Sequence, residues 1–389
     1  MKRRILIFST AYYPFVGGAE VAIKEITSRL SADFEFDLIT ARMDKKLPKF
    51  ERIGVVNVYR VGFGKETLDK LLLPFRGLFW ANRLSLRVKY YCLWGVMASY
   101  GSGAGYLLNI LRRLCGQRKI PMILTLQEGD SEAHLKYRWG GLIALSWKLA
   151  LAQSDFLTAI SNFLLQRAVK NGYKGEKALV PNGVDVGLFT RTIDERVKEN
   201  LKKNLGKKED DIFLVTHGRL AHKNALDDVI SSLVFLPENI NFIVIGKGVE
   251  GSSLQRQADS LGVSGRVKFL GFVDYRKIPE YLSVGDIFIR PSRSEGFGNS
   301  FIEAMAAGLP VIATPVGGIP DFISDNETGV FCSPDNPQSI VKAVNLLLED
   351  KLLRETVVQN AKKLVIEKYS WDKVAKDMKD LAFDYVVQV

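Results

Sequence analysis

Two glutamates stand at the ends of a glycine-containing stretch. Residues 295–303 read EGFGNSFIE, with Glu295 and Glu303 at the ends and Gly296 and Gly298 between them. Glycine lets a backbone come close to a ligand, and the free N–H groups and dipole at a helix N-terminus favour an anion such as a phosphate. The stretch therefore predicts a site for a polar, phosphorylated molecule.

The helix expected after this stretch carries a single charge. Between Phe301 and Ala307 every side chain except Glu303 is apolar or small, so we expect the helix to be buried on most sides. A buried carboxylate is costly unless it is hydrogen-bonded, so Glu303 needs a polar partner. The alternative is an internal ion pair on a core helix that ends at Gly308, but it leaves Glu295 and the glycines of the stretch unexplained.

Further candidates follow expected strands. Gly17 and Gly18 lie where the run ILIF gives way to a helix from Ala19, a position that presents backbone N–H groups to an anion. Arg219 and Lys223 follow the run FLVTH and are well placed to neutralise a diphosphate. The alternatives to a binding role are that the glycines only allow a short loop to turn, and that the two cations are solvated surface residues.

Short apolar runs alternate with helical stretches along the chain. The runs include ILIF, FDLIT, YCLWGVMA and PMILTL before residue 180, and FLVTHG, NFIVIG, DIFIRPS and PVIAT after residue 189. The helical stretches include 19–30, 105–115, 225–236, 252–261 and 337–349. This rhythm predicts parallel sheets with helices on both faces, and its repetition predicts two Rossmann-like units. A length of 389 residues suits two domains.

The composition is that of an ordinary soluble globular protein, with 47% hydrophobic and 25% charged residues. The opening MKRRILIFST imitates a signal peptide, but its apolar run is short and passes into a polar loop, so we interpret it as a strand. The apolar region 71–114 is interrupted by basic residues and is not expected to span a bilayer. Cys92, Cys115 and Cys332 are far apart and lack metal-ligand spacing, which indicates a reducing cytoplasm.

Positive charge is concentrated in the first half of the chain. Residues 1–185 contain 28 Lys and Arg against 15 Asp and Glu, a net charge of +13, whereas residues 186–389 carry −2. This asymmetry suggests a polyanionic partner, and anionic lipid, a phosphorylated acceptor and nucleic acid all remain open.

Aromatic and basic residues are interleaved within that half. The aromatic members are Phe75, Phe79, Trp80, Tyr90, Tyr91 and Trp94, and the basic members are Arg76, Arg83, Arg87 and Lys89. Where such a stretch reaches the surface, rings settle at the level of lipid headgroups and cations meet anionic lipid. A merely solvated basic face is the alternative, and residues 90–97 are expected to include a core strand.

The ordered set of motifs resembles the retaining glycosyltransferases of family 4, of the group 1 type. The matching segments are FSTAYYPFVGGAE at 8–20, PNGVD at 181–185, HGRLAHKN at 217–224, GFVD at 271–274, RPSRSEGFG at 290–298 and TPVGGIPDFI at 314–323. Glycine-rich loops are common, but six segments in the family's order are specific.

The resemblance implies the GT-B architecture, an α/β fold of two Rossmann-like, doubly wound parallel-sheet domains that face each other across a cleft. Residues 1–185 would form the N-terminal, acceptor-binding domain, and residues 186–370 the C-terminal domain that binds a nucleotide-sugar donor. The closing segment 371–389 would cross back to pack on the first domain.

The resemblance also implies roles for the candidate residues. Glu303 would bind the ribose hydroxyls and Glu295 the donor sugar, while Arg219 and Lys223 would neutralise the diphosphate. The other implied donor-binding residues are Gly17, Gly18, Gly246, Phe272, Val273, Phe297, Gly298 and Asn299. Catalytic roles fall to Glu295, Arg219 and Lys223, although neither glutamate is assigned as a nucleophile.

One loop departs from the family pattern. Members commonly have a histidine after the strand that corresponds to MILTL, and here the loop reads TLQEGD with Gln127 in that place. Glutamine cannot titrate, so Glu128, Asp130 and His134 are candidates for sugar contact or acceptor activation, with plain polar loop positions as the alternative. Ser161 resembles a position that lines the cleft.

No metal or organic cofactor is expected. The sequence lacks Asp-x-Asp after a strand, and its three histidines are not clustered. An NAD-dependent oxidoreductase would need a glycine fingerprint after the first strand, which ILIFSTAYYP lacks. A nucleotide-sugar epimerase of the same fold and a non-enzymatic polyanion-binding protein remain alternatives.

The resemblance implies a glycosyltransferase of the hexosyltransferase class, and the cysteine pattern predicts a cytoplasmic one. It would move a hexose-type sugar from a UDP- or GDP-sugar to an acceptor glycan, a lipid-linked acceptor or another cell-surface glycan precursor. An anionic membrane surface is a possible partner of the N-terminal domain, which would make the enzyme peripheral on the inner face of the membrane, and no nucleic acid is expected. The base, sugar, acceptor, linkage and oligomeric state stay open.

Overall fold

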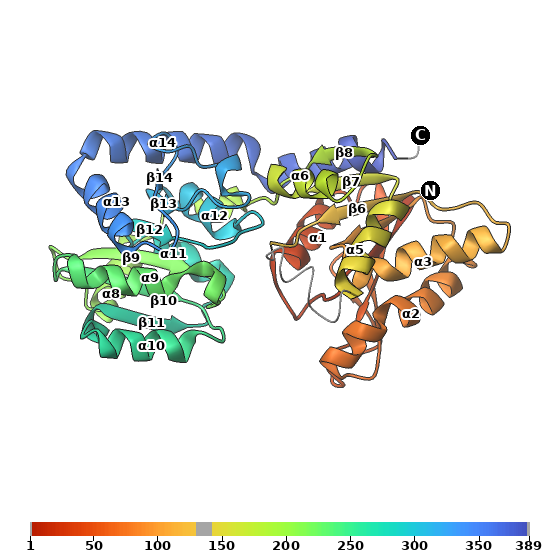
Figure 1. Cartoon of the computed structure of the whole chain (residues 1–389), viewed down its shortest axis with the longest axis horizontal. Helices are drawn as coiled ribbons and strands as arrows, with labels where there is room; N and C mark the ends of the chain where they lie inside the picture. The colour runs from red at the N-terminus through yellow and green to blue at the C-terminus, as the bar shows by residue number, and fades with distance from the viewer. Residues whose placement is uncertain (1, 130–141, 387–389) are drawn as a thin grey trace. The chain divides into compact units, whose positions relative to one another are not determined.

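The computed structural model describes residues 2–129 and 142–386. The chain divides into two compact units (Figure 1). Unit 1 combines Met1–Asn182 with Trp371–Val389, and unit 2 consists of Gly183–Ser370. Each unit is built on its own sheet of mainly parallel strands with covering helices, which confirms the predicted α/β class.

Unit 1 contains an eight-stranded sheet in the order β3-β4-β2-β1-β5-β6-β7-β8. Its strands are β1 (Arg3–Phe8), β2 (Phe34–Ala41), β3 (Phe50–Ile53), β4 (Val56–Val61), β5 (Cys92–Val96), β6 (Met122–Leu126), β7 (Phe156–Ala159) and β8 (Glu176–Leu179). Its helices are α1 (Gly18–Arg29), α2 (Glu66–Ser85), α3 (Gly101–Leu114), α5 (Leu142–Gln153), α6 (Asn162–Lys170) and α15 (Trp371–Asp377), which continues as a π-helix over Met378–Phe383. Neighbouring strands are parallel except β3 and β4, an antiparallel pair at the edge.

The apolar runs of unit 1 become strands that are covered on both faces. Every residue of β5 and β6 is buried, as expected for continuous apolar strands in a parallel sheet. The chain leaves β1 toward β2 and β4 and later returns to place β5 on the other side of β1. The strand order therefore reverses between β1 and β5, and ligands of such sheets bind beyond the carboxyl ends at this switch point.

Unit 2 contains a six-stranded parallel sheet in the order β11-β10-β9-β12-β13-β14. Its strands are β9 (Ile212–His217), β10 (Ile240–Ile245), β11 (Val267–Gly271), β12 (Ile287–Arg290), β13 (Val311–Ala313) and β14 (Val330–Phe331). Its helices are α7 (Val186–Phe189), α8 (Glu195–Leu205), α9 (Leu226–Ser232), α10 (Gly251–Ser260), α11 (Ile278–Leu282), α12 (Asn299–Ala307), α13 (Pro337–Glu349) and α14 (Lys351–Lys368).

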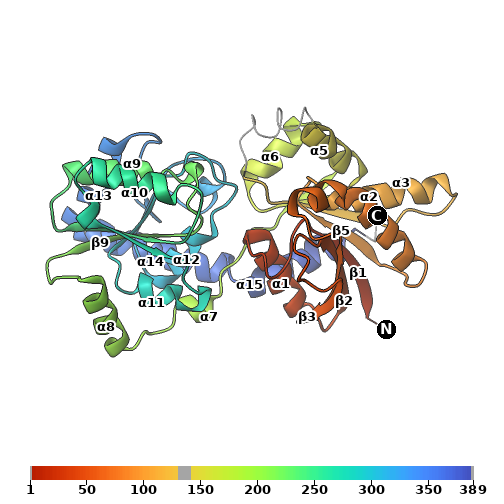
Figure 2. The same cartoon turned by 90° about the horizontal axis from the view of Figure 1, so that it is seen from below.

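The end of the chain returns to unit 1. Helix α15 packs against α1, and Figure 2 shows the two side by side. Trp371, Val374 and Met378 are buried in the core of unit 1 together with residues of β1 and α1. Phe383 makes edge-on ring contacts with Phe34 and Trp94, so the C-terminal segment contributes to the core of the first unit.

Helices α2 and α3 pack tightly over one face of the unit 1 sheet. A Cβ added to Gly103 would lie 2.8 Å from Cβ of Pro74, and one added to Gly77 would lie 2.7 Å from Cβ of Ala104. The glycines thus permit the close approach of the two helices. Across residues 2–129 and 142–386, no helix has both the length and the apolar character needed to cross a bilayer.

Candidate functional site

The carboxyl ends of β9 and β12 lie side by side in unit 2. The chain runs outward from β9 to β10 and β11 and then returns to place β12 on the other side of β9. The strand order therefore reverses between β9 and β12, which marks the expected ligand position of a parallel sheet. His217 is the last residue of β9 and Arg290 the last of β12, and both side chains are buried.

Arg290 organises the first half of the glutamate stretch. Its Nη2 donates to Oε2 of Glu295 at 2.5 Å, and its Nη1 donates to Oγ of Ser300 at 2.5 Å. Nζ of Lys223 lies 3.8 Å from Oε1 of Glu295. Burial alone would raise the pKa of Glu295, but the charges of Arg290 and Lys223 outweigh it and hold that pKa below its usual value. Glu295 is therefore a charged carboxylate fixed by two cations.

Glu303 meets His217 in the same region. Its Oε2 lies 3.2 Å from Nε2 of His217, and both side chains are buried. Burial raises the pKa of Glu303 to about 8, an effect that a hydrogen bond from Tyr275 partly offsets. Burial also lowers the pKa of His217 to about 3, and the charge of Arg290 acts in the same direction. At neutral pH both groups are uncharged, so the polar partners of Glu303 are a neutral imidazole and the Tyr275 hydroxyl.

Glycines bring the surrounding backbone close to this cluster. Gly246 follows β10 with a φ of +135°, and a Cβ there would lie 1.8 Å from the carbonyl oxygen of Gly218. A Cβ at Gly317 would lie 1.8 Å from the carbonyl oxygen of Glu295. Any side chain at either position would push these loops apart, so the geometry of the cluster requires glycine there.

The N-terminus of α12 follows directly from Gly298, which has a φ of +101°. Within residues 2–129 and 142–386, no protein acceptor takes the backbone N–H of Phe297 or Gly298. The ring of Phe297 is buried against Phe322, so only its backbone can face a ligand. The turn before α12 thus offers the amides of Phe297 and Gly298 where a helix dipole favours an anion.

The cations Arg219 and Lys223 lie in the loop after β9. Arg219 is exposed and, among the described residues, forms no ion pair. Nδ2 of Asn224 donates to the carbonyl of Arg219 at 2.5 Å, and the carbonyl of Lys223 accepts the N–H of Arg293 at 2.8 Å. Arg293 is held in turn by Asp227. The backbone of this loop is thus fixed, while its two cationic side chains extend from it.

Two residues after β11 complete the candidate donor site. Phe272 is 75% exposed and Val273 is partly exposed. An exposed ring beside the carboxyl end of a strand is suited to lie against a planar base. Tyr275, whose side chain hydrogen-bonds to Glu303, follows two residues later and contacts the ring of Phe189 at 5.4 Å between centroids.

In unit 1, Gly17 and Gly18 lie at the N-terminus of α1, as expected. The N–H of Gly17 donates to Oε2 of Glu20 at 2.8 Å. One of the two amides expected to face an anion is therefore already capped by a carboxylate from the first turn. Contact with a donor phosphate stays a prediction for both glycines.

Glu128 and Ser161 are bound by neighbouring backbone groups. The buried carboxylate of Glu128 accepts the N–H of Ser99 at 3.3 Å and of Gln127 at 3.1 Å, so it fixes the loop after β5. The hydroxyl of Ser161 is fully buried and caps α6 by accepting the N–H of Leu164 at 3.3 Å. These hydrogen bonds hold both side chains in place, and contact with a sugar stays a prediction for both.

Of the other residues predicted to contact the sugar or acceptor, the structure describes only Gln127. Oε1 of Gln127 accepts a hydrogen bond from Nδ2 of Asn182 at 3.4 Å. Asp130 and His134 lie outside the described residues. In the part of the chain that the structure describes, no three His, Cys, Asp or Glu side chains gather as metal ligands.

Sequence reasoning missed His217 and Arg290. Each is a polar residue that closes an otherwise apolar strand, IFLVTH and IFIR respectively. A polar residue that ends an apolar parallel strand lies at the edge of the sheet where ligands bind. The pattern of an apolar run closed by a polar residue could therefore have identified both positions from the sequence.

Two family profiles match successive parts of the chain. The family described as Glycosyltransferase Family 4 matches residues 16–188, and the family described as Glycosyl transferases group 1 matches residues 197–364. The chain belongs to the family 4-like, group 1 glycosyltransferases. It is an enzyme of that class, which confirms the resemblance drawn from the motifs.

Curated relatives of this glycosyltransferase align along nearly the whole chain. An uncharacterised glycosyltransferase of Methanocaldococcus jannaschii is 28% identical, with 96% of each chain covered. The N-acetyl-alpha-D-glucosaminyl L-malate synthase of Bacillus anthracis is 26% identical over 96% of this chain and 95% of the relative. The alpha-monoglucosyldiacylglycerol synthase of Acholeplasma laidlawii is 25% identical over 98% and 97%.

Solved structures share the fold of this glycosyltransferase. Sucrose-phosphate synthase of Thermosynechococcus elongatus superposes with a TM-score of 0.82 at 19% identity, and all of both chains is covered. HepE of Anabaena, in complex with UDP-glucose, superposes with a TM-score of 0.78 at 19% identity over 97% of this chain and 98% of HepE. These similarities confirm the predicted GT-B fold of two parallel-sheet domains.

Proposed function

We propose that this glycosyltransferase moves a hexose-type sugar from a UDP- or GDP-sugar to a lipid-linked acceptor, with retention of the anomeric configuration. In this proposal unit 2 binds the donor and unit 1 the acceptor. The observation that carries it is the buried cluster of Glu295, Glu303, Arg290 and His217 at the switch point of unit 2. Perturbed and buried titratable groups cluster at functional sites. The complex of HepE with UDP-glucose supports a nucleotide-sugar donor.

The donor contacts follow from the chemistry of each group. Glu303 accepts hydrogen bonds from the ribose hydroxyls, which supply the donors that a buried carboxylate needs. Phe272 and Val273 border the base, and the amides of Phe297 and Gly298 face the phosphates or the sugar. Asn299, the first residue of α12, follows these two amides in the chain.

Arg219 and Lys223 stabilise the departing diphosphate in this proposal. Negative charge on the diphosphate grows as the bond to the sugar breaks, so cations held near it lower the transition state more than the ground state. Lys223 lies 3.8 Å from Glu295, which places the cation beside the carboxylate assigned to the sugar hydroxyls. No metal is assigned a step, because two cations and a helix N-terminus supply the positive potential.

Retention of configuration rests on the family assignment. Glu295 and Glu303 are expected to bracket the donor, and neither is assigned as a covalent nucleophile. Glu295 is held by Arg290 and Lys223, an arrangement that suits a fixed hydrogen-bond acceptor for sugar hydroxyls.

A lipid-linked acceptor is favoured by the surface of unit 1. Helix α2 exposes Leu68, Phe75 and Phe79 on one side of the helix, interleaved with Arg76 and Arg83. Exposed rings and neighbouring cations suit the headgroup level of an anionic bilayer. The synthase of Acholeplasma laidlawii, whose name specifies a glucosylated diacylglycerol, supports the same class of acceptor.

The donor assignment is tested by titrating the protein with a panel of UDP- and GDP-sugars, by calorimetry and thermal shift. We expect one of them to stabilise the protein at saturation. The Glu303→Ala variant should bind that nucleotide sugar roughly tenfold to a hundredfold more weakly, or about 1.5–3 kcal/mol. Glu349→Ala, an exposed change on α13 in the same unit, should leave the affinity unchanged. Absence of binding by every nucleotide sugar would contradict the proposal, and formation of a sugar epimer without acceptor would indicate an epimerase.

A further inference from the structure

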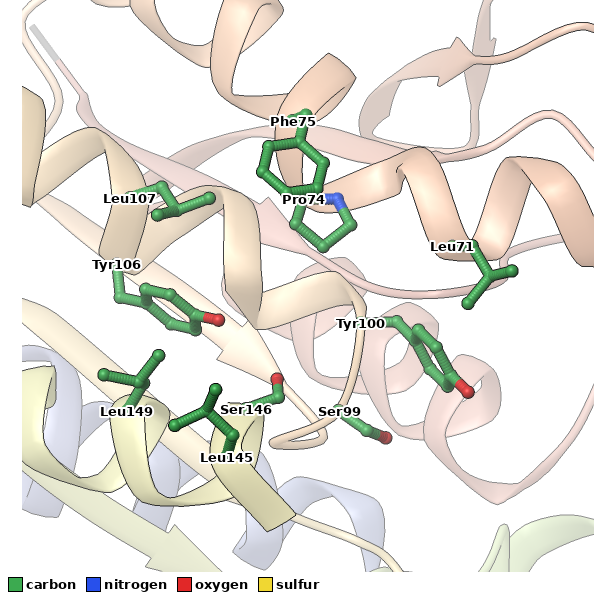
Figure 3. A pocket seen from close by; sticks show the side chains of 10 residues that line it. All are labelled: Leu71, Pro74, Phe75, Ser99, Tyr100, Tyr106, Leu107, Leu145, Ser146 and Leu149. Carbon is green, nitrogen blue, oxygen red and sulfur yellow. The ribbon is translucent and has the colours of Figure 1, made fainter. Parts of the chain in front are cut away.

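An apolar pocket of about 290 Å³ lies between three helices of unit 1. Figure 3 shows Pro74 and Phe75 of α2 opposite Leu145 and Leu149 of α5, and α3 contributes Tyr106 to the lining. The volume is just below that of most ligand pockets, which span roughly 300–1,000 Å³. It is therefore large enough for a small apolar group, and its lining is almost entirely hydrocarbon and aromatic.

The polar end of this pocket lies at the switch point of the unit 1 sheet. Ser99 and Tyr100, which line it, belong to the loop that follows β5. Because β5 and β1 flank the reversal of strand order, this is the edge at which unit 1 is expected to bind a ligand. The pocket thus extends from the expected acceptor edge to the space between α2, α3 and α5.

The loop at this polar end is rigidly built. Glu128 accepts the backbone N–H of Ser99 at 3.3 Å, and the hydroxyl of Ser146 on α5 donates to the carbonyl of Ala98 at 3.4 Å. Tyr100 has a φ of +54°, a conformation that a non-glycine residue adopts only where its surroundings impose it. A preformed loop at the mouth of a pocket lowers the ordering cost of binding.

The pocket opens onto the exposed side of α2. Phe75 lines it and is 66% exposed, and Leu145 lines it and is 54% exposed. Lys148 is exposed on α5 between the lining residues Leu145 and Leu149, and the guanidinium of Arg76 lies 3.8 Å from the ring centroid of Phe63. Apolar surface and cations therefore continue from the pocket to solvent, which complements an amphiphile with an anionic head.

We propose that this pocket binds one hydrocarbon chain of the lipid-linked acceptor, with the head at the loop after β5 and the chain between α2, α3 and α5. The inference rests on the proposed function and specifies the acceptor as an anionic lipid. One hydrocarbon chain of this lipid would leave the bilayer and enter the pocket. A protein helix, with a diameter of about 10–12 Å, does not fit a pocket of this size. Only a narrow apolar group fills it while leaving a polar head at the switch point.

The inference is tested with octyl and decyl phosphate, used below their micelle concentrations and titrated by calorimetry against the full chain. Burial of each added methylene should lower the dissociation constant about fourfold, so decyl phosphate should bind about fifteenfold more tightly than octyl phosphate. Leu149→Trp, which fills the pocket from a partly exposed position, should abolish this dependence. Leu114→Trp, at an 81% exposed position on α3 outside the lining, is the matched control and should bind as the wild type does.

Several results would overturn the proposal. The pocket is not a chain site if the two alkyl phosphates bind equally, if neither binds, or if Leu149→Trp binds as tightly as Leu114→Trp while both variants keep the wild-type melting temperature. If the protein self-associates and Leu149→Trp removes this association, the pocket would be assigned to a second copy of the chain instead. Titration with nucleotide sugars is a separate measurement on unit 2, so failure of the donor proposal is distinguishable from failure of the chain pocket.

Discussion

Oε2 of Glu303 and Nε2 of His217 lie 3.2 Å apart in the core of unit 2, and at neutral pH neither group is charged. The imidazole also hydrogen-bonds to the backbone of Ser300. Nε2 has no other hydrogen-bond partner within the described ranges. A protonated Glu303 that donates its O–H to Nε2 satisfies both buried groups without charge. Both buried groups are therefore paired without a ligand, and in our proposal Glu303 exchanges this partner for the hydroxyls of a nucleotide.

Donor binding should depend on the ionisation of Glu303. A carboxylate accepts two ribose hydroxyls, whereas the neutral acid must first lose the proton that it shares with His217. With a folded pKa of about 8, Glu303 is mostly anionic above that pH and mostly neutral below it. The observed affinity for a nucleotide sugar should therefore fall as the pH is lowered, by about 25-fold between pH 8.5 and 6.5.

Calorimetry in buffers of different ionisation enthalpy checks this linkage, because binding at pH 7 should release close to one proton. The matched variant is Glu303→Gln, which keeps the shape of the side chain and removes its titration. Glu303→Gln should bind more weakly and with no change of affinity over the same pH range. An affinity that is equally pH-dependent in wild type and Glu303→Gln would show that another group titrates.

Arg290 should be a positioning residue for Glu295. Arg290→Gln leaves a buried carboxylate with the N–H of Gly296 at 3.1 Å and the 3.8 Å contact to Lys223, and loss of one partner of a buried pair costs about 3–5 kcal/mol of stability. Urea unfolding measures this loss. The double variant Arg290→Gln/Glu295→Gln removes both charges and should recover much of the stability, so the single changes should be strongly non-additive. Additive effects would mean that the two side chains do not depend on one another.

The sequence predicted the helices and turns that hold the candidate site, because buried helices and glycine-bounded turns leave clear patterns. The expected apolar helix around Glu303 is α12, with buried residues from Ser300 to Ala306 and a left-handed cap at Gly308. The stretch 337–349 coincides with α13. Partners far apart in the sequence were harder to predict. The contact between His217 and Glu303 depends on the strand order, which brings β9 beside β12 and cannot be derived from either segment alone.

Helix α2 was not predicted, and its composition explains why. Residues 66–85 mix aromatic, apolar and basic side chains, and Pro74 stands in the interior, where it removes a helical hydrogen bond. Tertiary packing overrides this local preference, because the proline lies against Gly103 of α3. Half of the ten basic and aromatic residues noted in the sequence thus lie in α2, and part of this helix reaches the surface.

Single alanine changes at Arg219 and Lys223 should lower turnover more than donor affinity. Both side chains extend from a fixed loop, and charge on the diphosphate grows in the transition state. Steady-state kinetics with the donor identified by titration would separate kcat from KM. A matched control is Arg256→Ala, an exposed cation on α10 of the same unit. A rise in KM with unchanged kcat would assign these cations to ground-state binding alone.

Activity should survive excess EDTA, and the product should keep the anomeric configuration of the donor. The cations Arg219 and Lys223 and the N-terminus of α12 supply positive potential for the leaving group in our proposal. Assays with and without EDTA test the first expectation, and NMR of the glycosidic product tests the second. Activity that EDTA removes and magnesium or manganese restores would show that a metal carries this role. An inverted product would contradict retention.

The exposed side of α2 should bind anionic membranes. Leu68 and Phe79 lie outside the pocket lining and are 40% and 65% exposed, so their rings and methyl groups can enter the headgroup region. Neighbouring cations add about 1 kcal/mol each near anionic lipid, and exposed charges are screened over about 10 Å at 0.1 M salt. Co-sedimentation with phosphatidylglycerol vesicles should therefore show binding that weakens as salt is added, with little binding to phosphatidylcholine.

Matched double variants separate this surface from general hydrophobicity. Leu68→Ser/Phe79→Ser should lose most of the vesicle binding, because both apolar anchors are removed from one helix. Leu261→Ser/Phe235→Ser changes the same residue types at 41% and 58% exposed positions of unit 2 and should bind as the wild type does. Equal binding to neutral and anionic vesicles, or equal loss in the two variants, would contradict docking through α2. Binding to neither vesicle would favour a soluble acceptor, because an acceptor held in a bilayer requires the enzyme to reach that surface.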